Sequence, residues 1–315
     1  MRLGVTLNEP GGADPLGALR EQIEEAVADG FATAWLANIF GVDALTALAV
    51  AGRGVPGIEL GTAVVPTYPR HPAMLAQQAL TAQAALDGQL TLGIGLSHRI
   101  VIEDMFGYSF DKPARHMREY LDVLLPLLTV GSVGFKGETV SAAVGLSLPR
   151  AHPTPVLLAA LAPQMLRLAG AVADGTILWM AGPDTIAGHI VPKLTEAAAA
   201  AGRPDPRIVC TLPVCVTNDP DAARERAADT FSIYGQLPSY RAMLDIEGAA
   251  GPADVAIVGD EAAVAAGIEH LGTIGVTDFG AALFGDAVDQ ARTRALLSAL
   301  VGDLAGSGGP DGEAG

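Results

Sequence analysis

Cysteine, lysine and aromatic residues are scarce in this chain of 315 residues, which has two cysteines, three lysines and 5% aromatic residues. Cys210 and Cys215 lie five residues apart in one predicted strand, so their side chains point to opposite faces. Neither a disulfide nor a shared metal ion is therefore expected. The formal net charge of −16 and the scattered arginines argue against a nucleic-acid partner, which requires clustered Lys and Arg.

Long apolar runs and a targeting segment are also missing. Gly, Pro or a charged residue interrupts every apolar run well before the roughly 18 residues that a membrane-spanning helix needs. The N-terminal sequence MRLGVTLNEPGG has neither the charged start nor the long apolar segment of a signal peptide. We therefore expect a cytoplasmic protein without a membrane partner.

Short apolar segments alternate with longer helical segments along residues 1–304. Eight strands are predicted, at residues 3–7, 33–37, 58–65, 90–96, 156–160, 176–180, 207–216 and 276–283. Strands that are apolar on both faces indicate a parallel sheet covered on both sides. Eight such units predict an α/β protein with a (β/α)₈ TIM barrel, as one domain over residues 1–304. The Gly-rich, acidic residues 305–315 are expected to form a flexible tail.

Two stretches interrupt the alternation. Residues 131–150 are Gly-rich and alternate in polarity, which predicts a hairpin insertion. Residues 235–260 predict an extra helical excursion before the eighth strand. This excursion could place Tyr240 and Arg241 over the barrel mouth as a lid.

The carboxyl ends of the predicted strands, where barrel enzymes place their sites, are mostly uncharged. They hold no cluster of His, Asp and Glu that could bind a divalent metal, and no G-x-S-x-G nucleophile motif is present. A mostly apolar mouth suits a flat, conjugated cofactor that carries the reaction itself. The sequence predicts no metal site.

Several segments, in this order, resemble the luciferase-like monooxygenase superfamily and within it the branch that uses the deazaflavin F420. They are LGTAVVPTYPRHPAMLAQQALTAQ at 60–83, LTLGIGLSH at 90–98, RHMREYLDVL at 115–124, PVLLAALAPQMLRLAGAVADG at 155–175 and VGDEAAVAAGIEHL at 258–271. The resemblance covers about residues 1–304. It implies coenzyme F420 as the cofactor, with FMN as the alternative, a small-molecule substrate and a homodimer.

The resemblance also implies site residues. In this family the F420 ring leans on a bulge of the third strand with a non-prolyl cis peptide, which corresponds to the bond between Ala63 and Val64; an ordinary trans strand is the alternative. The phosphate-bearing tail of the cofactor meets the loop after the fifth strand and the start of the next helix, where free backbone N–H groups can hold an anion. The residues matched to the cofactor are Asn38, Ala63, Val64, Gly95, Leu96, Ser97, His98, Ala160, Leu161, Ala162, Pro163, Gln164 and Met165.

The chain departs from the sugar-phosphate dehydrogenases of the family at two strand ends. It has Asn38 and Ile39 where they carry Asp-His, and Ser97 and His98 where they carry a Glu. Oxidation of a sugar phosphate is therefore not expected. His98 is the predicted proton-transfer residue, because an imidazole donates or accepts a proton near neutral pH, and Asn38 is predicted to hydrogen-bond the cofactor or substrate.

The resemblance, taken with these residues, implies an F420H2-dependent reductase that transfers hydride from the deazaflavin C5 to an activated C=C or C=N bond of a small, largely neutral substrate. The alternatives are an FMN-dependent monooxygenase of the same superfamily and a non-catalytic flavin- or F420-binding protein.

His116 is expected on an outer helix, at a surface where charged side chains form salt bridges.

Overall fold

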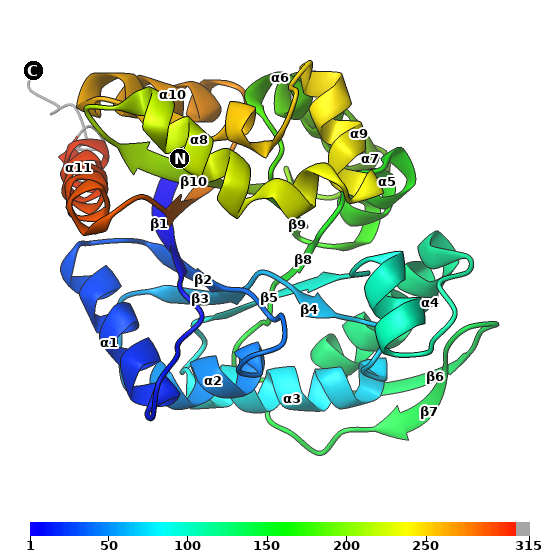
Figure 1. The fold of residues 1–315 in the computed structure, drawn as a ribbon. Helices are drawn as coiled ribbons and strands as arrows, with labels where there is room; N and C mark the ends of the chain where they lie inside the picture. The colour runs from blue at the N-terminus through cyan, green and yellow to red at the C-terminus, as the bar shows by residue number, and fades with distance from the viewer. Residues whose placement is uncertain (307–315) are drawn as a thin grey trace, which may run out of the picture.

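The computed structural model describes residues 1–306, with side chains up to residue 302, and contains the predicted barrel (Figure 1). Eight parallel strands form it: β1 (Arg2–Leu7), β2 (Thr33–Leu36), β3 (Glu59–Thr62), β5 (Leu90–Gly95), β8 (Val156–Leu158), β9 (Gly175–Trp179), β10 (Arg207–Val216) and β12 (Asp278–Leu283). Each strand pairs with the next in this order, and β12 pairs with β1, so the sheet closes. The prediction of a TIM barrel is confirmed.

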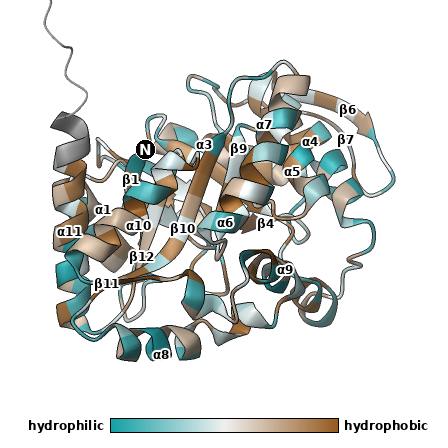
Figure 2. Ribbon diagram, turned by 90° about the horizontal axis from the view of Figure 1, so that it is seen from above, coloured by the Kyte–Doolittle hydropathy of each residue, from teal (hydrophilic) through white to brown (hydrophobic). Residues whose placement is uncertain are grey.

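Helices follow the strands and cover the barrel. They are α1 (Pro15–Ala28), α2 (Ala44–Ala51), α3 (Pro72–Ala85), α4 (Pro113–Thr129), α5 (Pro163–Val172), α6 (Pro183–Thr185), α7 (Val191–Ala200), α8 (Pro220–Thr230), α10 (Glu261–Thr273) and α11 (Ala287–Gly306). In Figure 2 the central strands are mostly hydrophobic, whereas α8 at the rim carries hydrophilic residues. Of the predicted tail, residues 307–315 lie outside the described residues.

Both predicted interruptions are present. Strands β6 (Ser132–Lys136) and β7 (Ser141–Gly145) form an antiparallel hairpin. The later excursion contains η3 (Ser232–Gly235), α9 (Pro238–Glu247), η4 (Pro252–Val255) and the short strand β11 (Ile257–Gly259), which extends the sheet beside β10.

Three segments differ from the sequence prediction. The third strand, which the apolar pattern predicts as continuous over residues 58–65, breaks after Thr62 and resumes as β4 (Val65–Pro66). Residues 63 and 64 bulge out of the ladder, as the family resemblance implies. A π-helical turn, η1 (Ile100–Met105), follows β5. A second one, η2 (Ile186–Ile190), divides the helix predicted over 183–201 into α6 and α7. Wide turns of this kind carry no distinct polarity pattern, so sequence periodicity does not reveal them.

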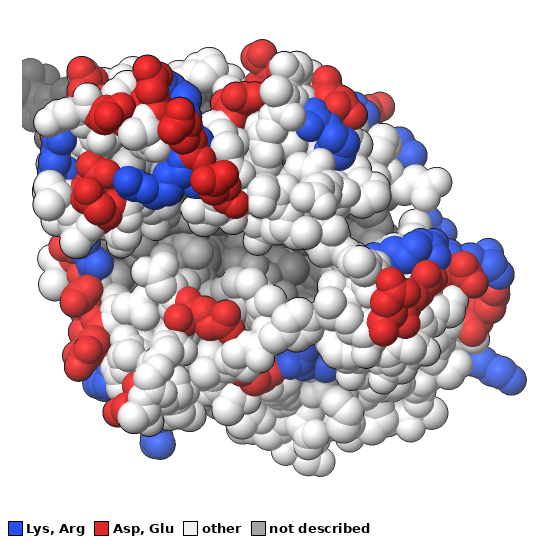
Figure 3. Space-filling view, viewed as in Figure 1, with Lys and Arg blue, Asp and Glu red and all other residues white. Residues whose placement is uncertain are grey.

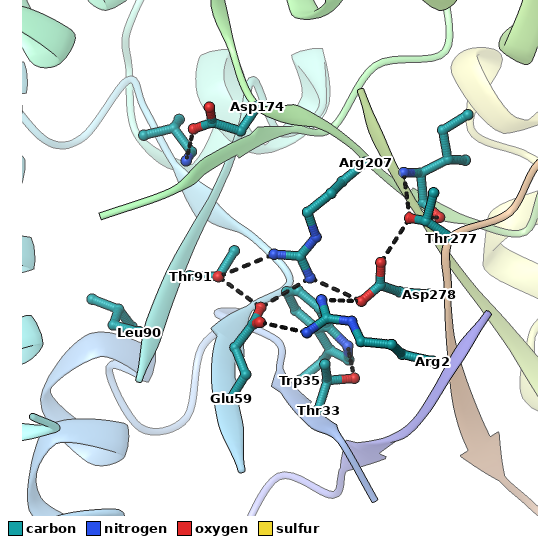
Figure 4. A network of polar contacts seen from close by, with 12 residues as sticks. Arg2, Thr33, Trp35, Glu59, Leu90, Thr91, Asp174, Arg207, Thr277 and Asp278 are labelled. Carbon is teal, nitrogen blue, oxygen red and sulfur yellow. Dashed lines mark hydrogen bonds and ion pairs between the residues drawn. The ribbon is translucent and has the colours of Figure 1, made fainter. Parts of the chain in front are cut away.

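The barrel interior is ionic at the amino ends of its strands. Arg2 and Arg207 each form ion pairs with both Glu59 and Asp278 (Figure 4). These ion pairs link the strands β1, β3, β10 and β12. Burial by itself would lower the pKa of Arg207, but Asp278 and Glu59 outweigh it and raise that pKa. This network fills the amino-terminal end of the barrel, opposite the end where the site is expected.

The middle of the barrel is filled by Trp35, which is fully buried. A Cβ added at Gly61 would lie 2.1 Å from the Trp35 ring, and one at Gly280 would lie 3.0 Å from it. Glycine at these positions therefore makes room for the indole. Since the bottom and the middle are filled, only the carboxyl end of the barrel is left for a ligand.

Two further sequence expectations concern the chain as a whole. Cys210 and Cys215 are buried and free in β10, and they pack in separate core clusters, as the spacing predicts. Within residues 1–306, none of the helices combines the length and the apolar character needed to cross a membrane.

Candidate active site

The carboxyl ends of the barrel strands form a mouth that opens on the face seen in Figure 3, where the surface is hollowed between the segments of α8 and α9 and those of α1 and α2. Thr6 and Trp179 lie near the carboxyl ends of β1 and β9.

The bulge after β3 forms one wall of the mouth. The bond between Ala63 and Val64 is cis, as the resemblance implies. The Val64 side chain lies against β5, where a Cβ at Gly93 would be 3.1 Å from its Cγ1 and a Cβ at Gly95 would be 2.7 Å from its Cγ2. Glycine at position 95 therefore leaves the space that Val64 occupies, and a Cβ at position 93 would also press against Val64.

His98 lies beside this wall, directly after β5. Ser97 turns the chain with φ at 61°, and the His98 carbonyl then accepts the N–H groups of Val101 and Ile102, which begins η1. The imidazole lies 5.5 Å from the Tyr240 ring, centroid to centroid. Burial lowers the pKa of His98 below its usual value, so the ring is mostly neutral at pH 7.

Asn38 follows β2 and is half-buried. Its Oδ1 accepts the N–H of Ala44 at 3.0 Å, which fixes the start of α2. The Nδ2 amide group can donate hydrogen bonds to a ligand, and Oδ1 keeps one further lone pair.

The loop after β8 leads into α5 without a capping side chain. Ala160 is buried, whereas Ala162, Pro163 and Gln164 are exposed. The first N–H groups of α5 consequently have no side-chain acceptor and are free to meet an anion. His189 of η2, which the sequence analysis did not identify, donates from Nε2 to the Leu161 carbonyl at 2.8 Å and holds this loop.

Aromatic rings cross the mouth from β9 to α9. Measured between ring centroids, Trp179 lies 5.7 Å from Tyr234, and Tyr234 lies 5.2 Å from Tyr240. Tyr240 in turn lies next to the His98 ring. Burial raises the pKa of both phenols, so they stay protonated. Tyr240 thus lies where a lid was expected, but Arg241 does not: it pairs with Asp245 and donates to the carbonyls of residues 249 and 250.

His116 is buried, which contradicts the expected surface position. Its ring stacks on Tyr68 at 3.9 Å, and its Nε2 lies 3.1 Å from the Thr67 hydroxyl. Burial lowers its pKa to about 4, so it is a neutral support behind β4. Its i,i+4 spacing to the buried Tyr120 on α4 is the signal that would have placed it on the apolar face.

Three buried polar atoms near the mouth lack a hydrogen-bond partner among the described residues: Thr6 Oγ1, Tyr68 Oη and Trp179 Nε1. Unpartnered groups of this kind are costly unless a ligand or water satisfies them. The glycine-lined wall, the uncapped start of α5 and these atoms fit a flat, polar-edged cofactor with an anionic tail. Within the described part of the chain, no three His, Cys, Asp or Glu residues gather as a metal site.

Comparisons with known proteins agree with this geometry. The sequence model of the luciferase-like monooxygenase family matches residues 1–278. A Mycobacterium tuberculosis protein, provisionally named a coenzyme F420-dependent oxidoreductase, is 32% identical over 252 residues, which are 74% of this chain and 72% of that protein.

Two solved structures share the fold. One is a coenzyme F420-dependent tetrahydromethanopterin reductase from Methanopyrus kandleri, with a TM-score of 0.75 and 22% identity over 94% of this chain and 97% of that one. The other is the oxygenating constituent of 3,6-diketocamphane monooxygenase from Pseudomonas putida in complex with FMN, with a TM-score of 0.75 and 16% identity over 97% and 98%. At these identities the likeness is one of fold.

Proposed function

This chain belongs to the luciferase-like monooxygenase family, and on that premise we propose that it is a coenzyme F420-dependent oxidoreductase acting as an F420H2-dependent reductase. The observation that carries the proposal is that the Ala63–Val64 bulge, His98 and the uncapped start of α5 follow β3, β5 and β8, whose carboxyl ends lie at the same end of the barrel. The name of the M. tuberculosis relative favours F420 over FMN.

Each element of the mouth has a role in this proposal. The bulge residues Ala63 and Val64, together with Gly95 and Leu96, support the deazaflavin ring, and Ser97 sets the turn that aims His98. The backbone N–H groups of α5 in segment 160–165 hold the phosphate. When bound, the reduced cofactor supplies hydride from its C5 to an electron-poor C=C or C=N bond of a small, largely neutral substrate.

His98 donates the proton that completes the reduction, and the Asn38 Nδ2 group donates a hydrogen bond to the cofactor or substrate. Tyr240, protonated at neutral pH, covers His98 and excludes water from the mouth. We also propose that the protein forms a homodimer and is located in the cytoplasm.

The alternative, an FMN-dependent monooxygenase, is favoured by the shared fold of the FMN-bound monooxygenase constituent. Equilibrium titration of the purified protein with F420 and with FMN, followed by fluorescence, separates the two. Tight binding of F420 without a response to FMN is expected. Tight binding of FMN without a response to F420 would favour the monooxygenase instead. If F420 binds, a turnover assay with F420H2 and enones or imines distinguishes a reductase from a non-catalytic F420-binding protein.

A further inference from the structure

A cationic groove lies outside the barrel, between α4 and α5. Its volume is about 710 Å³, within the range of roughly 300–1,000 Å³ that ligand sites occupy. Arg115 and Arg118 line it from α4 and Arg167 lines it from α5, whereas Asp122 is its only carboxylate.

The charge of this groove is poorly neutralised, in a chain with a net charge of −16. Most arginines of the described residues pair with a carboxylate; those that do not are Arg53, Arg118, Arg150 and Arg167. Two of these four line the groove. Arg115 does pair with Glu138, but it shares that carboxylate with Lys112.

The groove is continuous with the site assigned to the cofactor phosphate. Gln164, in the first turn of α5, belongs both to the groove lining and to segment 160–165. A chain that leaves the phosphate at the start of α5 therefore meets Arg167 one turn further along this helix and Arg118 on the facing helix.

We propose that this groove binds the oligo-γ-glutamate tail of F420, an inference that rests on the proposed function. Each γ-linked glutamate carries one free carboxylate, so the tail presents a row of negative charges to the arginines. Elsewhere the acidic surface repels such a tail. Exposed ion pairs are individually weak and screened by salt, so several glutamates are needed for a measurable gain.

The test compares the dissociation constants of F420 carrying five glutamates and of the phospholactate form without glutamate, by fluorescence titration. At low salt we expect the pentaglutamyl form to bind about 10-fold more tightly, and this ratio to approach one in about 1 M NaCl. The double variant Arg118→Gln/Arg167→Gln should abolish the ratio and leave the affinity of the glutamate-free form unchanged. The control Arg53→Gln/Lys136→Gln changes the net charge equally, outside the groove, and should keep the ratio.

Equal affinity of the two forms for the unaltered protein, or an equal loss in the control variant, would overturn the tail site while leaving F420 binding intact. Failure of every F420 form to bind would instead remove the proposed function. A changed oligomeric state of the groove variant in light scattering would assign the groove to a contact between copies and also overturn the proposal.

Discussion

His98 follows β5 and lies 5.5 Å from the Tyr240 ring, centroid to centroid, so its removal tests the proposed proton transfer. His98→Ala should leave the dissociation constant of F420 within about threefold and lower turnover by about 10²–10⁴-fold, the usual contribution of a general acid or base. His98→Gln, which keeps a polar side chain of similar size, should be equally slow. Steady-state rates with F420H2 check this, and full activity of both variants would exclude His98.

The buried position of His98 also sets the pH dependence of the reaction. Because burial lowers its pKa below 6.5, the protonated form that a reduction needs accumulates only on the acid side of that value. The kcat/KM for reduction should therefore rise as the pH falls through the pKa of His98, and the reverse oxidation should rise with pH and level off near neutrality. Profiles between about pH 5 and 8 measure both, and His98→Gln should flatten them.

Gly95 matters because of the space it leaves for Val64. In Gly95→Ala the new methyl group would meet Val64 Cγ2 at 2.7 Å and Ala159 Cβ at 3.2 Å, so Val64 must move toward the mouth. Overpacking of this kind costs about 1–3 kcal/mol, and we expect F420 affinity to fall about 10-fold. Gly134→Ala on the hairpin, where nothing lies within 4 Å of the added atom, is the control. Titration and thermal unfolding measure the two effects, and equal behaviour of the two variants would contradict the assignment of the wall.

Helix α9 is held over the mouth by Glu247, which accepts the N–H groups of Asp184 at 3.2 Å and Thr185 at 2.7 Å. Glu247→Ala leaves these groups at the start of α6 without their acceptor, which costs about 1–3 kcal/mol for a buried group. Faster hydrogen exchange over residues 232–247 and a raised KM with little change in F420 affinity are expected. Asp245→Ala, which removes only the exposed partner of Arg241, should change neither. Unchanged exchange in Glu247→Ala would show that α9 is held by its apolar face alone.

The strands and most helices were predictable because each barrel strand is buried on both faces, which leaves an apolar run in the sequence. The apolar pattern did not reveal the break at Ala63, which only the family resemblance implied, and nothing in the sequence revealed the π-helical turn η2. Both depend on the packing of residues distant in sequence. His98 and the start of α5 were placed at the mouth by the rule that parallel strands end together. The contacts of His116 and His189 were missed, since each rests on a tertiary partner: Thr67 and Tyr68 for one, the Leu161 carbonyl for the other.

The whole molecule separates stability from chemistry along the barrel axis, with the ion network at one end and the mouth at the other. The two ends differ in exposure, because Asp278 of the network is almost fully buried whereas a site must stay accessible to its ligand. Changes to the network should therefore lower the free energy of unfolding without altering ligand binding by the folded protein.

Arg207→Met tests this separation. It removes one of the two cations that face Glu59 and Asp278, and Asp278 is almost fully buried, with a side chain 2% exposed. Breaking a buried pair by removing one partner costs about 3–5 kcal/mol, to be measured by urea unfolding, while the dissociation constant of F420 should stay constant. Arg292→Gln, which breaks the more exposed pair with Glu261, should cost at most about 1 kcal/mol. A loss of F420 affinity in folded Arg207→Met would show that strain at the ionic end reaches the mouth through Trp35, and would refute the separation.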